Sequence, residues 1–232
     1  MTEFDWQPYR DHYAHTLANA PEDVRREIMR LGMAPFASDP LRTLRPAVLL
    51  VVSMKPYGGP DRQYPCGWEE RSERPGLHRW YDGDRAGSNF VREADQLVRL
   101  VLAELGSSLR PREVPNTYAY FYRAADARQL KAFGLARIDC GALHRQLLGV
   151  VRPEVVLCIG NGPAPSAFAT YHALLGGTVG TARAAPRLLL RSFTTAEGLR
   201  VIGVPHLSYV RTEQFAEVLR ARVAGGPSFF GT

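Results

Sequence analysis

An unbroken apolar run near the start of the chain predicts a buried strand. Residues 46–53 read Pro-Ala-Val-Leu-Leu-Val-Val-Ser, and a continuous β-branched run of this length is typical of a strand covered on both faces. A helix is predicted further along, because apolar positions between residues 90 and 105 recur every three or four residues. Ser88 is its expected N-cap and Gly106 its expected stop. Its apolar face consists of Phe90, Ala94, Leu97, Val98, Val101, Leu102 and Leu105.

Strand-like and helix-like segments alternate through the rest of the chain. Strand patterns occupy residues 117–122, 154–159, 187–193 and 199–204, and helical patterns occupy residues 122–150, 164–175 and 212–223. Thr212 is the expected cap of the last helix. Such alternation predicts the α/β class, with a mostly parallel sheet and helices on both faces. We expect a single domain over residues 1–232, with an N-terminal helical extension over 1–40 and an α/β core over 41–225.

Composition and charge narrow the classes of protein. The chain has 232 residues, 45% of them apolar, and carries 29 basic and 23 acidic side chains. Of the basic residues, only Lys55 and Lys131 are lysine. Residues 110–232 hold 15 basic and 7 acidic side chains, whereas residues 1–109 hold 14 and 16. The basic C-terminal half is compatible with a surface that binds a polyanion, and equally with a solvated surface in a protein from an arginine-biased proteome.

Membrane-spanning, secreted and disulfide-rich classes are not indicated. The longest apolar run, residues 47–52, is far shorter than the roughly 20 residues that cross a bilayer, and the first ten residues are polar. We therefore expect a cytoplasmic protein without a membrane partner. Cys66, Cys140 and Cys158 are odd in number and widely spaced, so no disulfide framework, metal or cofactor is expected. We expect a monomer.

The loops that leave the carboxyl ends of the predicted strands are the candidate site, because ligands of parallel α/β sheets bind there. These loops are residues 55–68, 123–126, 160–166 and 205–211. The first begins Lys55-Pro56-Tyr57-Gly58-Gly59-Pro60 and ends at Trp68. The last reads Pro205-His206-Leu207-Ser208-Tyr209-Val210-Arg211.

In this order, the first and last loops resemble those of the uracil-DNA glycosylase superfamily. In that superfamily an aspartate or asparagine precedes Pro-Tyr or Pro-Gly, a stacking aromatic residue follows at the spacing of Trp68, and a His-Pro-Ser loop leaves the last strand. The segment Val155–Phe168 is similar to the family's third strand and the helix that follows it, and Tyr118–Tyr122 is similar to the strand that ends in a base-reading asparagine. The resemblance covers residues 40–225. It implies a three-layer α/β/α fold with a central, mostly parallel four-stranded sheet, and it implies DNA as the partner.

The resemblance also implies how a base would be bound. An enzyme that acts on a base within DNA first extrudes it from the stack. Trp68 would stack on the extruded base and Tyr57 would close one side of its pocket. His206 would donate a hydrogen bond to the pyrimidine O2 as negative charge builds on the leaving base. The alternative for Trp68 is a core aromatic residue that covers the sheet edge. The alternative for His206 is a loop histidine whose hydrogen bonds are made by backbone groups.

Other residues of these loops would contact the DNA backbone. Ser208 and the amides after it would bind a phosphate, and Val210, with Tyr209 or Arg211, would wedge into the gap that the base leaves. Ser166 stands in a Gly-Asn-Gly-Pro-Ala-Pro-Ser loop that would present backbone donors to a phosphate. The alternative for this loop is a plain strand-to-helix turn, and Tyr209 and Val210 would then be packing residues.

The chain departs from the family at the residue that performs the chemistry. Lys55 stands where the family has its acid or amide, and Phe121 or Tyr122 stands where it has a base-reading asparagine. Two positive charges 4 Å apart repel by about 4 kcal/mol at an effective dielectric of about 20, so a protonated lysine would oppose a cationic sugar. Three outcomes are open: a neutral Lys55 amine attacks the sugar C1′, Asp61 or Asp126 manages the water, or the pocket binds without cleaving. As a fourth reading, the Lys55 ammonium merely extends into solvent.

The leading hypothesis is a divergent uracil-DNA glycosylase-like hydrolase of DNA repair, which binds damaged or single-stranded DNA and removes or recognises a modified base. The alternative is a noncatalytic nucleic-acid or nucleotide-binding relative that has lost glycosylase activity. A hydrolase acting on a small molecule is disfavoured, because no G-x-S-x-G motif is present.

Overall fold

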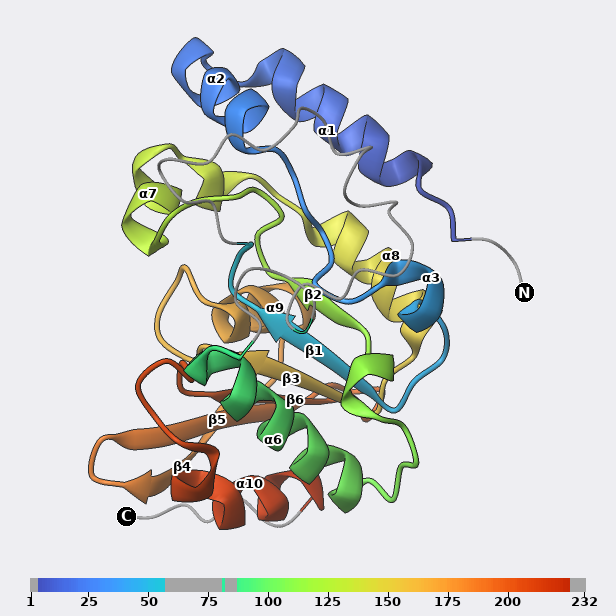
Figure 1. Cartoon of the computed structure of the whole chain (residues 1–232), viewed down its shortest axis with the longest axis vertical. Coiled ribbons are helices and arrows are strands. Elements are labelled where there is room, and N and C mark those ends of the chain that lie inside the picture. Colours follow the sequence, from blue (N-terminus) through green and yellow to red (C-terminus); the bar gives the residue numbers. More distant parts are fainter. Residues whose placement is uncertain (1–3, 57–80, 82–86, 226–232) are drawn as a thin grey trace.

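Four neighbouring parallel strands form one side of the sheet, and two antiparallel strands form the other. The computed structural model describes residues 4–56, 81 and 87–225. Across the sheet the order is β2 (Asn116–Tyr118), β1 (Leu49–Ser53), β3 (Val155–Ile159), β6 (Arg200–Val204), β5 (Leu188–Thr194) and β4 (Gly180–Ala185). The first four are parallel, whereas β5 is antiparallel to β6 and β4 is antiparallel to β5 (Figure 1). The α/β class is confirmed.

The expected number of four strands is wrong, because the sheet has six and is mixed. The segment Gly180–Ala185 alternates small and polar residues and carries no apolar strand pattern. It becomes β4 by pairing with β5, and only Pro186 and Arg187 connect the two. A connection of two residues joins antiparallel strands, whereas parallel strands need a crossover of a dozen or more residues. This hairpin extends the sheet beyond β6.

Helices cover both faces of the sheet. Figure 1 shows α6 (Asn89–Glu104) and α10 (Ala216–Val223) in front of it, and α8 (Gly141–Val151) and α9 (Ala167–Leu175) behind. The expected ends of α6 are confirmed: the Ser88 hydroxyl accepts a hydrogen bond from the Val91 N–H, and Gly106 has a φ of +62° beyond the last turn. Strand β1 is buried at all five positions, as the apolar run predicts.

The N-terminal segment closes the free edge of β2. Helices α1 (Gln7–Asn19) and α2 (Glu22–Leu31) lead into an extended stretch, in which Met33 and Phe36 form antiparallel bridges with Tyr122 and Thr117. A short helix, α3 (Pro40–Thr43), then precedes β1. The remaining short elements are η1 (Pro111–Glu113), α7 (Ala127–Ala132), η2 (Leu135–Arg137) and η3 (Thr212–Phe215). None of the helices in the described ranges is long and apolar enough to cross a membrane.

Candidate functional site at the carboxyl ends of the parallel strands

The four expected loops leave the sheet at the same edge, because β2, β1, β3 and β6 are neighbours and parallel. Within the described residues, β1 leads into Lys55, β2 into residues 119–126, β3 into residues 160–166 and β6 into residues 205–211. The base-binding candidates Tyr57 and Trp68, and the alternative acid Asp61, lie outside the described residues, so their roles stay predictions.

Lys55 connects the loop after β1 to the loop after β2. Its half-buried ammonium donates hydrogen bonds to the backbone carbonyl oxygens of Ala124 and, at 3.2 Å, of Ala125. Hydrogen bonds from a charged donor contribute about 1.5–3 kcal/mol each. Both hydrogen bonds come from the single Nζ atom, so one side chain contacts two consecutive carbonyl oxygens of the neighbouring loop. The side chain therefore holds two site loops together instead of extending freely into solvent.

Asp126, the alternative acid that lies within the described residues, caps a helix. Its carboxylate accepts a 2.7 Å hydrogen bond from the Gln129 N–H and so caps the N-terminus of α7. That backbone hydrogen bond lowers the pKa of Asp126, with smaller contributions from Arg128 and from the charge of Lys55. A cap of this kind contributes about 1 kcal/mol to helix stability. The carboxylate is ionised at neutral pH and is already engaged by the start of α7.

Phe121 and Tyr122 do not face the solvent at this edge. Their exposed fractions are 0% and 1%, and the Phe121 ring lies 4.8 Å from the ring of His144 and 5.9 Å from that of Tyr9. Burial raises the pKa of the Tyr122 hydroxyl well above its ordinary value. In this structure both rings belong to the core that joins the N-terminal segment to β2.

His144, next to Phe121, is a fully buried histidine. One ring nitrogen, Nε2, lies 3.1 Å from the Ala119 carbonyl oxygen, and the other, Nδ1, lies 3.2 Å from the Tyr171 hydroxyl. The carbonyl oxygen can only accept, so Nε2 carries a proton and Nδ1 accepts from the tyrosine. Burial lowers the pKa of His144 to about 4. The ring is therefore neutral at pH 7 and satisfied on both sides.

His206 is exposed in the loop after β6. Its Nδ1 accepts a 3.3 Å hydrogen bond from the Ser208 backbone N–H. A neutral imidazole that accepts at Nδ1 carries its proton on Nε2, so the ring acts as a donor through Nε2. The ring centroid lies 5.5 Å from that of Phe90, at the start of α6, and 6.1 Å from that of Tyr209. These rings limit the orientations of the imidazole.

The rest of this loop mixes exposed and buried side chains. Tyr209 is 89% exposed, the largest exposed fraction of any large apolar residue described, whereas Val210 is half-buried against the core. Ser208 is half-buried and uses its N–H on His206. Arg211 forms an exposed ion pair with Glu213 at 3.6 Å. Of the residues expected to contact DNA, Tyr209 is thus the most accessible.

The loop after β3 is built as a turn into α9. Ser166 is 5% exposed, accepts from the Ala169 N–H at 3.1 Å and donates to the Gly162 carbonyl at 2.7 Å. Asn161 donates its side-chain amide to the carbonyl oxygens of Gly203 and Leu189, on β6 and β5. These hydrogen bonds fix the loop to its neighbouring strands and agree with the plain strand-to-helix turn.

Glu93 positions the loop after β6, and sequence patterning did not identify it. Its buried carboxylate accepts a 2.7 Å hydrogen bond from the Thr212 N–H, and the Thr212 hydroxyl donates to the Glu93 carbonyl oxygen at 3.0 Å. The expectation that Thr212 caps the last helix is therefore wrong, because its hydroxyl bonds to α6 instead. The available signal was an acid flanked by Phe90 and Ala94 on the apolar side of a helix.

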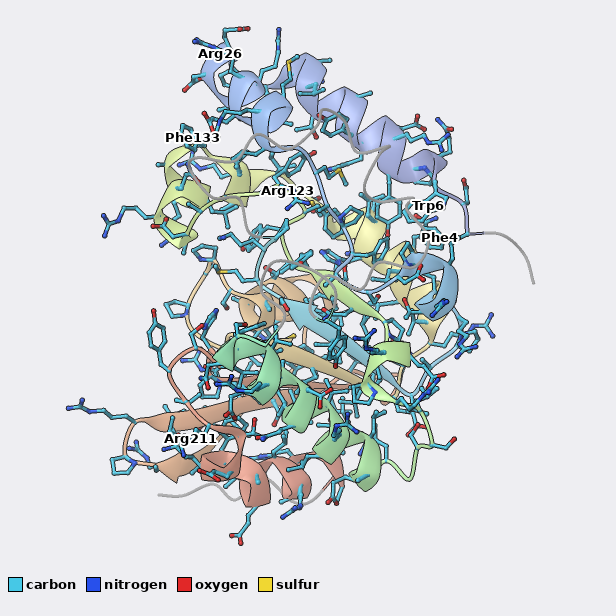
Figure 2. All side chains as sticks on the ribbon, viewed as in Figure 1. Phe4, Trp6, Arg26, Arg123, Phe133 and Arg211 are labelled. Carbon is cyan, nitrogen blue, oxygen red and sulfur yellow. The ribbon has the colours of Figure 1, made fainter. Side chains whose placement is uncertain are left out.

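Arg123 and Arg211 lie on different sides of the site. Figure 2 shows Arg123 above the strands, toward α7, and Arg211 below them, toward α10. Arg123 is only 4% exposed, so its guanidinium belongs to the interior. Among the described residues, no group of three histidine, cysteine or acidic side chains is arranged to hold a metal ion.

No protein-family model and no curated protein matches this chain.

Proposed function

We propose that the protein is a divergent uracil-DNA glycosylase-like protein that binds DNA and recognises a damaged or modified base outside the stack. The observation that carries this proposal is the state of His206. It lies on the loop after the last parallel strand, is exposed, and accepts at Nδ1 from the Ser208 N–H. That leaves Nε2 as the protonated nitrogen, which is the form needed to donate to a carbonyl oxygen of a base.

The aromatic surroundings of His206 support the same function. Phe90 and Tyr209 lie within about 6 Å of the imidazole, a spacing at which aromatic rings interact, and Tyr209 extends into solvent with 89% of its surface exposed. An exposed ring beside a hydrogen-bond donor suits a base or the gap that an extruded base leaves. Stacking of a base on an aromatic ring contributes about 1–3 kcal/mol, and a donor aimed at developing charge contributes about 3–4 kcal/mol in catalysis.

The engagement of Lys55 and Asp126 favours recognition without cleavage. Lys55 donates to two carbonyl oxygens, and the carboxylate of Asp126 accepts the amide of α7. Both groups are thus already bonded to backbone groups of the protein itself. Base removal is the second candidate function, and the donor state of His206 is the observation that favours it.

Binding is tested by fluorescence anisotropy with labelled single strands and duplexes that carry uracil, hypoxanthine, xanthine or an alkylated base. We expect Tyr209→Ala to weaken binding about tenfold, the loss that about 1.4 kcal/mol of stacking gives. His206→Ala should reduce the preference for the modified base more than the overall affinity. His15→Ala, on an exposed face of α1, is the matched control. Salt should weaken binding, and absence of binding at low salt would refute the proposal.

Cleavage is tested on the same substrates by alkaline treatment, which breaks the strand at any abasic site, and by trapping with borohydride. If the protein only recognises the base, the wild type yields neither product. An adduct that is trapped by the wild type and lost in Lys55→Ala would establish the amine nucleophile and overturn recognition without cleavage. Scission without a trapped adduct, lost in His206→Ala, would instead establish base removal by water.

A further inference from the structure

A cleft of about 1030 Å³ lies between α3, the first three turns of α6 and η1. Its walls come from residues 41–45, which precede β1, and residues 110–113, which precede β2. Those segments lie at the amino ends of the strands (Figure 1). None of the described candidate residues Lys55, Ser166, Ser208, Tyr209 or His206 lines the cleft, although its wall at the start of α6 adjoins Phe90, which contacts His206. Pockets for small molecules are commonly about 300–1,000 Å³, and this cleft is large enough for such a ligand.

Arginine dominates the walls of this cleft. The described lining has six arginines and only two carboxylates, Asp95 and Glu113. Both carboxylates are occupied by one arginine each, since Arg99 bonds Asp95 at 2.7 Å and Arg110 bonds Glu113 at 3.2 Å. The arginines are Arg42, Arg45, Arg92, Arg99, Arg110 and Arg112.

Arg42 forms an ion pair with Asp39 at 3.4 Å, whereas Arg45 and Arg92 pair with no carboxylate in the described ranges and so add positive charge to the cleft. Arg92 donates to the neutral carbonyl of Gly87 at 2.8 Å, and Arg112 lies over the ring of Tyr81, 4.7 Å from its centroid. Arg45 forms no ion pair with any residue in the described ranges, although its charge helps to lower the pKa of Glu113, after the larger effect of Arg110. Planar guanidinium groups bind phosphate oxygens in pairs of parallel hydrogen bonds.

An apolar and aromatic part accompanies the charges. Leu41, one of three large hydrophobic residues exposed in the described chain, is 54% exposed and lines the cleft together with Leu44 and Val91. The Tyr81 hydroxyl donates to Asp95 at 2.8 Å, and burial together with that hydrogen bond raises the pKa of Tyr81. The tyrosine is thus held in place as a neutral ring between Asp95 and Arg112.

We propose that this cleft binds a small phosphate-bearing ligand with a planar or apolar portion, of the nucleotide class. Arginines of the lining would hold the phosphate, and the ring of Tyr81 with the leucines would contact the base. A mononucleotide fits a cleft of this size, whereas a continuous DNA strand requires a groove that continues past it. The site is independent of DNA recognition at the carboxyl ends.

Isothermal titration calorimetry of the whole protein tests the cleft with nucleoside monophosphates and diphosphates, inorganic phosphate, pyrophosphate, an unphosphorylated nucleoside and a short oligonucleotide. We expect a nucleotide to bind more tightly than pyrophosphate or the nucleoside alone, because only the nucleotide reaches both parts of the cleft. Arg45→Ala should weaken nucleotide binding about tenfold, and Arg45→Glu should weaken it further. Arg26→Ala is the control. Arg26 lies on α2, far from the cleft (Figure 2), and its side chain is exposed.

The outcomes separate this site from the proposed function. Nucleotide binding that is reduced by Arg45→Ala and unaffected by Tyr209→Ala supports the cleft, whatever the DNA experiments show. Failure of every small phosphate ligand to bind at low salt overturns it. So does binding that Arg45→Glu leaves unchanged, and so does binding of the oligonucleotide alone, which would make the arginines part of a DNA surface.

Discussion

Acidification should destabilise the protein through His144. The ring is fully buried in α8 between the Ala119 carbonyl, the Tyr171 hydroxyl and the ring of Phe121. Burial is the largest cause that lowers the pKa of His144 from 6.5 to about 4, and the hydrogen bond to Ala119 and the charge of Asp139 oppose it only in part. Protonation would place a second N–H against the tyrosine hydroxyl and an unpaired charge in the core.

The direction and the size of this change in the free energy of unfolding follow from proton linkage. Between pH 6.5 and 4 the unfolded chain binds a proton at this histidine and the folded chain does not, so stability falls as the pH decreases through this range. One pKa unit corresponds to about 1.36 kcal/mol. With these two pKa values, lowering the pH from 7.5 to 5 should cost about 2 kcal/mol of the free energy of unfolding. Domains of this kind are stable by only about 5–15 kcal/mol, so the change is measurable.

Urea denaturation at pH 7.5 and 5 measures the effect in the wild type and in His144→Gln, whose amide can still donate to the Ala119 carbonyl. The variant should be less stable at pH 7.5 but should lose about 2 kcal/mol less than the wild type on acidification. An equal loss in both proteins would refute the reasoning. If the variant does not fold, NMR of the wild-type imidazole decides the question, because a ring that titrates above pH 6 contradicts burial of the neutral form.

Three substitutions test packing and capping by thermal and urea denaturation. Gly203→Ala on β6 should destabilise by about 1–3 kcal/mol, because the new Cβ would lie 2.6 Å from Cδ2 of Phe168; a neutral result would contradict the close packing of α9 on β6. Gly149→Ala in α8 has no atom within 4 Å of its Cβ and should stabilise by up to about 1 kcal/mol, so a loss of stability would count against a regular helix there. Ser88→Ala should cost about 1 kcal/mol, since it removes the hydroxyl that accepts from the Val91 N–H; an unchanged midpoint would show that the cap contributes nothing.

Local signals located the ends of α6 and the buried central strands, although the expected cap at Thr212 was wrong. Ser88 and Gly106 delimit α6 as expected, because capping and a positive φ are properties of a few adjacent residues. The buried run of β1 and the strand β3 also agree with prediction, because continuous apolar stretches have no stable exposed form. The edge strand β4 was missed, since its pairing with β5 supplies what its own composition lacks.

For the candidate site too, the sequence predicted the positions of the loops but not the contacts of their side chains. The sequence placed Lys55, residues 123–126 and His206 on loops at the carboxyl ends of strands, because alternation of strands and helices determines on which edge each loop emerges. The sequence could not show which groups these residues hydrogen-bond to. Lys55 meets carbonyl oxygens 69 and 70 positions away, and Glu93 meets Thr212 across 119 positions.

The sequence by itself therefore determined the class of fold, the ends of α6 and the arginine-rich composition, all of which follow from periodicity, local backbone geometry or counting. Only the tertiary structure decided that Lys55 holds two loops together, that Phe121 and Tyr122 are core residues, and that arginines from α3, α6 and η1 surround one cleft. The physical reason is that hydrogen bonds, burial and surplus charge depend on which distant segments the packed sheet brings into contact.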